Sequence, residues 1–191
     1  MTIEQAFQEH ERVMAKSAKS LPPVIAAVAD KVLACLSGGH SIFACGNGGS
    51  AADAEHLVAE LVGRYRDERP GLAAMALTAS GPTLTALAND YGYERVFARQ
   101  IEALAQQGDI LFAISTSGNS SNVIEAARAM RKRQGVVIAL TGSDGGRLVA
   151  EADVVVLAPS RVVARIQEVH GFCIHAMVEA LESHLTRGAP E

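Results

Sequence analysis

The sequence predicts an α/β fold, a three-layer sandwich in which a five-stranded parallel sheet is flanked by helices. Five short segments are almost continuously apolar, as strands buried on both faces are. Segments with the helical spacing of apolar residues separate these strands along the chain, and this alternation is typical of parallel sheets. The 191 residues are 49% hydrophobic, which is enough for one sizeable core. We therefore expect a single domain over residues 1–191.

Two helices are expected before the first strand. Polar and apolar residues mix with helical spacing from Ile3 to Ser20. The next segment, "LPPVIAAVADKVLACLSGGH" (21–40), has prolines near its start and glycines at its end, which is the usual asymmetry of helix termini.

The rest of the chain alternates between strands and helices. The expected strands are residues 41–46, 73–78, 109–115, 135–142 and 153–159. Helices are expected between them, for example over residues 121–134, and a long last helix over residues 162–186. Its apolar residues form a stripe that needs a surface to pack against: Ile166, Val169, Phe172, Cys173, Ala176, Met177 and Ala180.

Composition excludes several classes of function. The net charge is −4 and the 17 basic residues are scattered, so the sequence predicts neither a nucleic-acid partner nor an anionic membrane. Cys35, Cys45 and Cys173 lie among apolar neighbours, which favours buried free thiols in a reducing compartment. The charged N-terminal segment lacks a secretory apolar region, and no apolar run reaches the roughly 20 residues of a membrane span. We expect a cytoplasmic protein.

Two turns follow predicted strands and open predicted helices. They are "GNGGSAAD" (46–53) and "STSGNSSN" (115–122). Glycines let backbone N–H groups approach an anion, the helix N-terminus supplies free donors, and serine hydroxyls add hydrogen bonds. Neither turn has the pattern of a Walker or dinucleotide loop. Such clusters can also simply cap helices, but two of them at one sheet edge favour a phosphate-binding site.

Four polar residues are candidates for chemistry. His56 and Glu60 are four residues apart, so they share one helix face, although a solvated surface pair has the same spacing. Gln167 and His175 lie on the last helix. Eight residues of regular helix separate side chains by a rise of about 12 Å, so these two cannot readily share one metal. Either the helix begins after Gln167, or the two ligands come from different chains.

The motifs resemble a known family. "CGNGGSAADAEHLVAEL", "LTALANDYGYERVFARQ", "GDILFAISTSGNSSNVI", "ALTGSDGG" and "RIQEVHGFCIH" are similar to segments of the bacterial phosphoheptose isomerases, members of the sugar isomerase (SIS) domain superfamily. The resemblance covers nearly the whole chain. It implies a flavodoxin-like SIS fold, a homotetramer with active sites between subunits, and residues 1–38 as helices used in oligomerisation. It also implies conversion of sedoheptulose 7-phosphate into D-glycero-D-manno-heptose 7-phosphate for lipopolysaccharide or other surface glycans.

The resemblance assigns roles residue by residue. Glu60 and His175 match the positions that handle protons during isomerisation. The positions that match substrate-binding residues are Asn47, Gly48, Gly49, Ser50, Glu60, Arg64, Asn89, Asp90, Ser115, Thr116, Ser117, Ser120 and Gln167. Arg64 is expected near the site of a neighbouring subunit. The positions that match zinc ligands are His56, Glu60, Gln167 and His175, with one zinc ion per subunit. Its role, catalytic or structural, stays open, because a tightly bound Glu60 is not a free base.

Two other functions remain possible at this point. Some relatives bind a replication initiator without catalysis, and a sugar-phosphate sensor would bind the substrate without turning it over. The non-catalytic kind lacks the counterparts of Glu60 and His175, whereas this chain has both, which favours an enzyme. One departure is Ala164, where some relatives have an acidic residue near the sugar.

Overall fold

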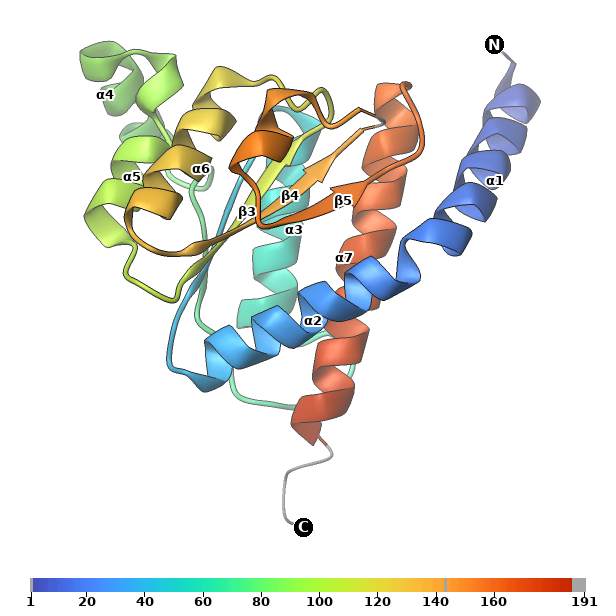
Figure 1. The fold of residues 1–191 in the computed structure, drawn as a ribbon, viewed down its shortest axis with the longest axis horizontal. Helices are drawn as coiled ribbons and strands as arrows, with labels where there is room; N and C mark the ends of the chain where they lie inside the picture. Colours follow the sequence, from blue (N-terminus) through green and yellow to red (C-terminus); the bar gives the residue numbers. More distant parts are fainter. Residues whose placement is uncertain (1, 143, 187–191) are drawn as a thin grey trace.

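The computed structural model describes residues 2–142 and 144–186. Figure 1 shows the arrangement of the elements. In chain order they are α1 (Ile3–Ser20), α2 (Pro22–Ser37), β1 (Ile42–Cys45), α3 (Gly49–Val62), β2 (Ala74–Ala76), α4 (Gly81–Tyr91), η1 (Tyr93–Arg95), α5 (Ala98–Leu104), β3 (Ile110–Ser115), α6 (Ser121–Lys132), β4 (Val136–Thr141), η2 (Gly146–Glu151), β5 (Val154–Leu157) and α7 (Val163–Thr186). The five predicted strands and the predicted helices are therefore confirmed at nearly the expected bounds.

The five strands form one parallel sheet in the order β2-β1-β3-β4-β5. From β1 the chain crosses outward to β2 through α3, then returns past β1 to β3 and continues to β4 through α6. The crossovers that follow β1 and β3 thus run in opposite directions, and the carboxyl ends of these two strands form the topological switch point of the sheet. Ligands of open parallel sheets bind at such a point.

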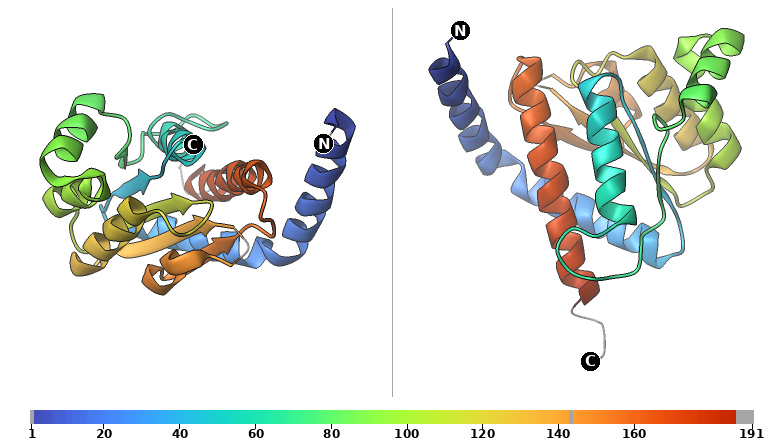
Figure 2. Two further views of the ribbon diagram at one scale, coloured as in Figure 1. Left: turned by 90° about the horizontal axis from the view of Figure 1, so that it is seen from above. Right: turned by 180° about the vertical axis from the view of Figure 1, so that it is seen from behind.

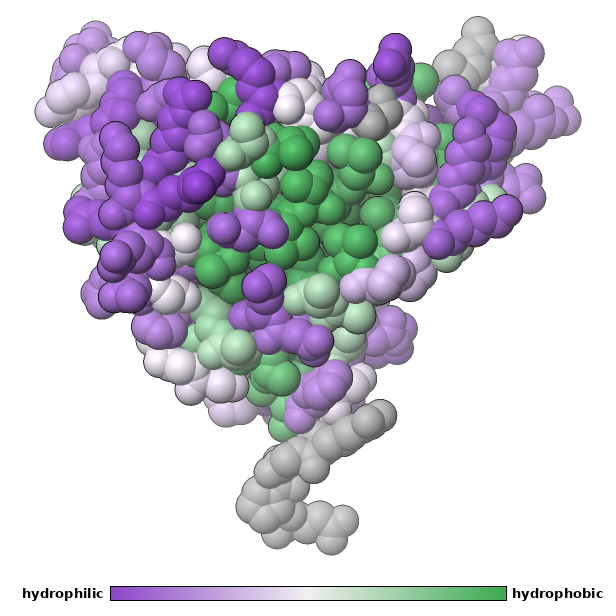
Figure 3. Space-filling view, in the orientation of Figure 1, coloured by the Kyte–Doolittle hydropathy of each residue, from purple (hydrophilic) through white to green (hydrophobic). Residues whose placement is uncertain are grey.

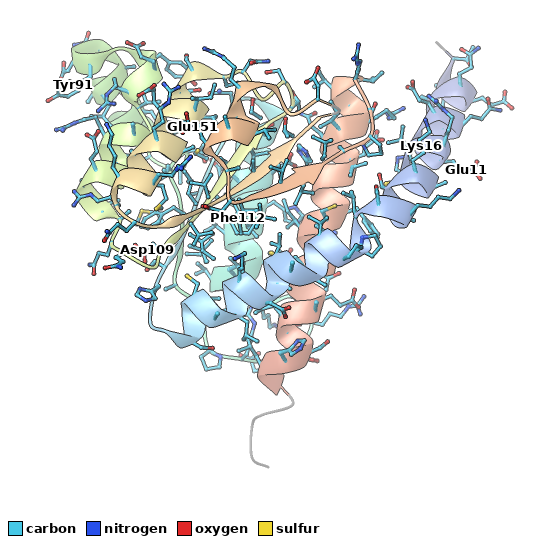
Figure 4. All side chains as sticks on the ribbon, in the orientation of Figure 1. Glu11, Lys16, Tyr91, Asp109, Phe112 and Glu151 are labelled. Atoms are coloured by element: carbon cyan, nitrogen blue, oxygen red, sulfur yellow. The ribbon has the colours of Figure 1, made fainter. Side chains whose placement is uncertain are left out.

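Side chains from the two sheet faces enter two separate cores. Alternate residues of one strand, such as Ile42 and Ala44, join the core shared with α2, α3 and α7. Phe43 and Cys45 point the other way, into the core with α5 and α6. Figure 2 shows these two layers on either side of the sheet, and Figure 4 shows Phe112 of β3 in the middle of the molecule. The predicted three-layer sandwich is confirmed.

Helix α1 extends away from this body (Figures 1 and 2). It begins with a capping box, in which the Thr2 side chain accepts from the Gln5 N–H and the Gln5 side chain accepts from the Thr2 N–H. An apolar groove of about 810 Å³ lies between α1, α2 and α7. Figure 3, in the orientation of Figure 1, shows a hydrophobic area over β4 and β5, bordered by hydrophilic side chains.

Within the described residues, no single helix is long and apolar enough to cross a membrane. The pair α1 and α2, bent by 65° where they join, passes the same test only by length and composition. Ile25, Val28 and Val32 of α2 are buried in the protein core.

The apolar stripe of α7 divides between the core and the surface. Ile166, Val169, Cys173 and Met177 are buried against the sheet, whereas Phe172 is 57% exposed at the groove. All three cysteines are buried free thiols, as predicted. Burial raises the pKa of each thiol above its ordinary value, which keeps them protonated and unreactive.

Candidate active site

The first predicted turn joins β1 to α3 at the switch point. Gly48 has a φ of 56°, a conformation that favours glycine, and α3 begins at the next residue. Ser50 is buried, while Asn47 is half-buried and Gly49 is exposed. Asp53 lies one helical turn before His56, and its Oδ2 atom has no hydrogen-bond partner among the described residues. Burial raises the pKa of Asp53 to about 6, against the opposing charge of His56.

The second predicted turn joins β3 to α6 beside the first. The Ser115 hydroxyl donates to Ser120 Oγ at 3.0 Å, and Ser117 Oγ accepts from the Asn119 N–H at 3.1 Å. A hollow of about 270 Å³ lies over this turn and is lined by Thr116, Ser117, Asn119, Asp144, Ser160, Arg161, Val163 and Ile166. The exposed hydroxyl of Ser117, the helix N-terminus and the adjacent hollow fit the expected phosphate loop.

Helices α3 and α7 lie side by side and bring three predicted residues together. His175 Nε2 lies 3.0 Å from His56 Nε2, and His56 Nε2 lies 3.2 Å from Glu60 Oε1. One ligand atom from each residue lies within 4.8 Å of the others. All three side chains are partly buried, so the cluster is shielded yet reachable from solvent. A single chain is therefore sufficient to bring these three groups together.

Gln167 lies elsewhere within the same chain. A Cβ built on Gly49 would lie 2.7 Å from Cδ of Gln167, and closer still to its amide nitrogen. The amide thus lies at the start of α3, about two turns from His56. The suggestion that the last helix begins after Gln167 is wrong, because α7 begins at Val163. Gln167 as a ligand of the same metal stays a prediction that requires a second chain.

The loop after α3 contains a buried ion pair that the sequence did not reveal. Glu182 of α7 accepts from the backbone N–H groups of Tyr65, Arg66 and Asp67 at 3.0, 2.9 and 3.2 Å. Arg69 Nε lies 3.2 Å from Glu182 Oε1, with side chains 5% and 4% exposed. Burial alone would raise the pKa of Glu182, but these N–H groups and the Arg69 charge lower it.

Arg69 also binds the end of α3. Its guanidinium donates to the carbonyl oxygens of Glu60 and Leu61, the latter at 3.0 Å. The Tyr65 ring, held by the same loop, lies 5.6 Å from the His175 ring between centroids. The ion pair therefore ties together the loop and the two helices that contribute the cluster. The only sequence signal is an arginine and a glutamate more than a hundred residues apart, which predicts no contact.

Three further predicted residues, Asn89, Asp90 and Arg64, are exposed. Asn89 and Asp90 are exposed at the end of α4, where the Asn89 amide donates to Asp90 Oδ1 at 2.9 Å. Arg64 is exposed in the loop after α3, with its Nε 3.7 Å from Glu68. Their roles toward substrate stay predictions.

The donor set of the cluster fits a zinc ion. Zinc takes imidazole nitrogens at about 2.0–2.1 Å and carboxylate oxygens at similar distances, and tetrahedral geometry then separates two nitrogens by about 3.3 Å. The two facing Nε2 atoms, 3.0 Å apart, are close to that spacing. Three protein ligands are the number found in catalytic zinc sites, which keep one position open.

Comparisons with known proteins agree with this geometry. A family model for the SIS domain matches residues 6–142. A phosphoheptose isomerase from Shewanella sp. (strain ANA-3) is 50% identical over 186 residues, which cover 96% of this chain and 94% of the relative. The structure of phosphoheptose isomerase GmhA from Neisseria gonorrhoeae has a TM-score of 0.90 at 46% identity, covering 95% of this chain and 97% of that one. A phosphoheptose isomerase from Francisella tularensis has a TM-score of 0.93 at 36% identity, covering 96% and 100%.

The parallel sheet, the two turns at its switch point and the family match define an α/β protein of the SIS domain class. Within that class, the chain belongs to the phosphoheptose isomerase family. The resemblance carried by the motifs is confirmed, and the protein is an isomerase rather than a binding protein without catalysis.

Proposed function

We propose that this protein isomerises sedoheptulose 7-phosphate to D-glycero-D-manno-heptose 7-phosphate, for the synthesis of lipopolysaccharide or another surface glycan. The observation that supports this most directly is the convergence of His56, Glu60 and His175 from α3 and α7. Proton-handling groups of this kind are what an aldose–ketose isomerase needs. The expected phosphate loop at the switch point fits the phosphoryl end of such a substrate.

The reaction moves one proton between neighbouring carbons without net oxidation. Removal of a proton from C1 of the ketose breaks a C–H bond and gives an enediol, and reprotonation at C2 gives the aldose while a proton moves from O1 to O2. Glu60 is suited to carry the carbon-bound proton, and His175 is suited to carry the proton between oxygens. Hydrogen-bond donors around these oxygens stabilise the negative charge of the intermediate.

Turnover of sedoheptulose 7-phosphate by the purified protein tests this function. We expect Glu60→Gln to fold normally and to lose activity by a factor on the order of 10² or more, which is the usual effect of removing a general base. Glu55→Gln is the matched control, because Glu55 lies on the same helix and is exposed. Binding without turnover by the wild type would instead indicate a sensor.

We also propose that the cluster binds one zinc ion per subunit, held by His56, Glu60 and His175. Bound zinc would either polarise a substrate carbonyl as a Lewis acid or hold the cluster in place, and a Glu60 bound tightly to it would not be a free base. Because binding to the folded state alone stabilises it, zinc should raise the melting temperature of the wild type. His175→Ala should lose both the metal, measured by elemental analysis, and this stabilisation. His184→Ala on the exposed side of α7 should keep both, and zinc retained by His175→Ala would refute the site.

The family resemblance and the apolar groove support a homotetramer built from the N-terminal helices, residues 1–38, and α7, with the 191 residues as one SIS domain in each subunit. Ile3 and Phe7 of α1 are 82% and 73% exposed, and Phe172 of α7 is 57% exposed. Such apolar surface favours contact with another chain. Light scattering on the same samples would give the mass of the assembly. The three free thiols favour a cytoplasmic location.

A further inference from the structure

The side chains of Asn47 and Asn122 bind each other across the two turns. Asn47 Nδ2 donates to Asn122 Oδ1 at 2.8 Å, and Asn122 Nδ2 donates to Asn47 Oδ1 at 2.9 Å. The Tyr93 hydroxyl, from η1, donates to the same Asn47 oxygen at 2.9 Å. Asn122 is 2% exposed at the start of α6. Because β1 and β3 are neighbours, this network spans the switch point where the substrate is expected.

Counting donors and acceptors shows what Asn47 has left for a ligand. An amide oxygen has two lone pairs and an amide nitrogen has two hydrogens. Both lone pairs of Asn47 Oδ1 are used, by Asn122 and by Tyr93. One hydrogen of Asn47 Nδ2 is used by Asn122. Among the described residues, the side chain of Asn47 therefore has one N–H without a partner and no free acceptor.

The side-chain oxygen of Asn122 also has both of its lone pairs in hydrogen bonds. This Oδ1 atom accepts from Asn47 and from the Val123 N–H at 3.0 Å. The bond from a backbone N–H fixes which end of the Asn122 amide is the oxygen, and Asn122 in turn fixes the orientation of Asn47. Without these partners, the Asn47 amide can rotate by half a turn and present its oxygen instead.

We propose that Asn122 and Tyr93 are positioning residues that hold Asn47 as a hydrogen-bond donor to a substrate oxygen at the switch point, toward the phosphoryl end of the substrate. This inference rests on the proposed function. A contact to an oxygen away from the reacting carbons binds the ground state and the transition state alike, so it acts on KM rather than on kcat. The arrangement would also disfavour a ligand that places a hydrogen-bond donor opposite Asn47.

Tyr93→Phe tests the proposal with little risk to the fold, because Tyr93 is 57% exposed and keeps its ring. We expect KM for sedoheptulose 7-phosphate to rise about fivefold, the effect of one neutral hydrogen bond, with kcat nearly constant and the melting temperature unchanged. The matched control is Tyr91→Phe. Tyr91 is 50% exposed, and its ring contacts the Arg99 guanidinium rather than the turns. Figure 4 shows Tyr91 on α4 at the edge of the molecule.

Asn122→Asp is a second variant. Its carboxylate still accepts from Asn47 but donates nothing to Asn47 Oδ1, so we expect a larger rise of KM than in Tyr93→Phe. A readout independent of activity is the exchange of the asparagine side-chain amide protons with water, measured by NMR on the wild type and on Tyr93→Phe. We expect slow exchange for the bonded protons of Asn47 and Asn122 in the wild type, and faster exchange for Asn47 in the variant.

The outcomes separate this inference from the proposed function. A wild type that fails to turn over sedoheptulose 7-phosphate contradicts the function, and the amide exchange then still tests the network. Wild-type kinetics in Tyr93→Phe would overturn the proposal, and so would amide protons of Asn47 and Asn122 that exchange as fast as those of a free amide.

Discussion

Replacing Gly49 by alanine should separate activity from stability. Gly49 is the first residue of α3, and its φ lies outside the left-handed region that favours glycine. Alanine fits such a backbone and should stabilise the fold by between about 0.4 and 1 kcal/mol. A domain of this size would then melt at the same temperature or up to about 3 °C higher.

The new methyl group would nevertheless collide with Gln167. The Cβ atom would lie 2.7 Å from Cδ of Gln167 and closer still to its amide nitrogen, so the amide must withdraw by more than about 1 Å to reach ordinary van der Waals contact. This movement costs little free energy, because the amide is the far end of the flexible Gln167 side chain. A displacement of about 1 Å in a positioning residue can cost 10²-fold in rate. We expect kcat/KM to fall by at least tenfold in a protein as stable as the wild type.

A double-mutant cycle tests the cause. If Gly49→Ala acts by displacing Gln167, it should have no further effect once Gln167→Ala has removed the amide. Gly81→Ala is the matched control, because Gly81 begins α4 and nothing lies within 4 Å of a Cβ added there. Independent, additive effects of Gly49→Ala and Gln167→Ala on kcat/KM would refute the reasoning.

Two further predictions concern buried charge. Burial lowers the pKa of His170 to about 4, although its hydrogen bond to the Thr141 backbone acts in the opposite direction. Below about pH 6.5 the unfolded chain therefore binds a proton at His170 that the folded chain does not bind. Stability should therefore fall by about 2 kcal/mol between pH 7 and pH 5 on account of His170. His170→Gln should show a pH dependence smaller by that amount in urea unfolding, since Asp53 and other groups titrate alike in both proteins. Glu182→Gln leaves Arg69 without its counter-charge and should cost about 3 kcal/mol, measured in the same way. Glu151→Gln, whose partners Arg128 and Arg131 are about half exposed, should cost less than about 1 kcal/mol, and equal losses in the two variants would contradict the role of burial.

The sequence predicted the sheet well because burial on both faces leaves a direct trace. Strands such as Ile110–Ser115 are buried throughout, and only a continuous apolar run satisfies that environment. The two turns were predicted for a similar reason, since glycine and serine at a strand end have a local chemical meaning. His56 and Glu60 were predicted as neighbours because four residues of helix place them together.

The sequence could not predict contacts that depend on how distant elements pack. The Asn47 and Asn122 amides are 75 residues apart, and their pairing follows from β1 lying next to β3. Asn122 was within a predicted turn, yet nothing local distinguishes a buried asparagine there from a helix cap. Arg69 and Glu182 carry ordinary charges, and only the fold reveals that their side chains are about 95% buried.

Helix α7 lies beside α3 along the whole length of α3, and this packing links three contacts described above. Gln167 lies against Gly49 at the start of α3, and His175 contacts His56 about two turns further along the same helix. Glu182 contacts the loop that follows the end of α3. The steps along α7 are eight and seven residues, about two turns each, and the step from Gly49 to His56 on α3 is seven, so the same face of α7 returns to α3 each time. Figure 2 shows the two helices side by side.

Any slide of α7 along α3 would change all three contacts at once. The buried Arg69–Glu182 pair at one end and the Gln167–Gly49 contact at the other therefore fix the spacing of His56 and His175 between them. For this reason we expect Glu182→Gln to reduce activity more than its loss of stability alone would explain, whereas Glu151→Gln should leave activity unchanged.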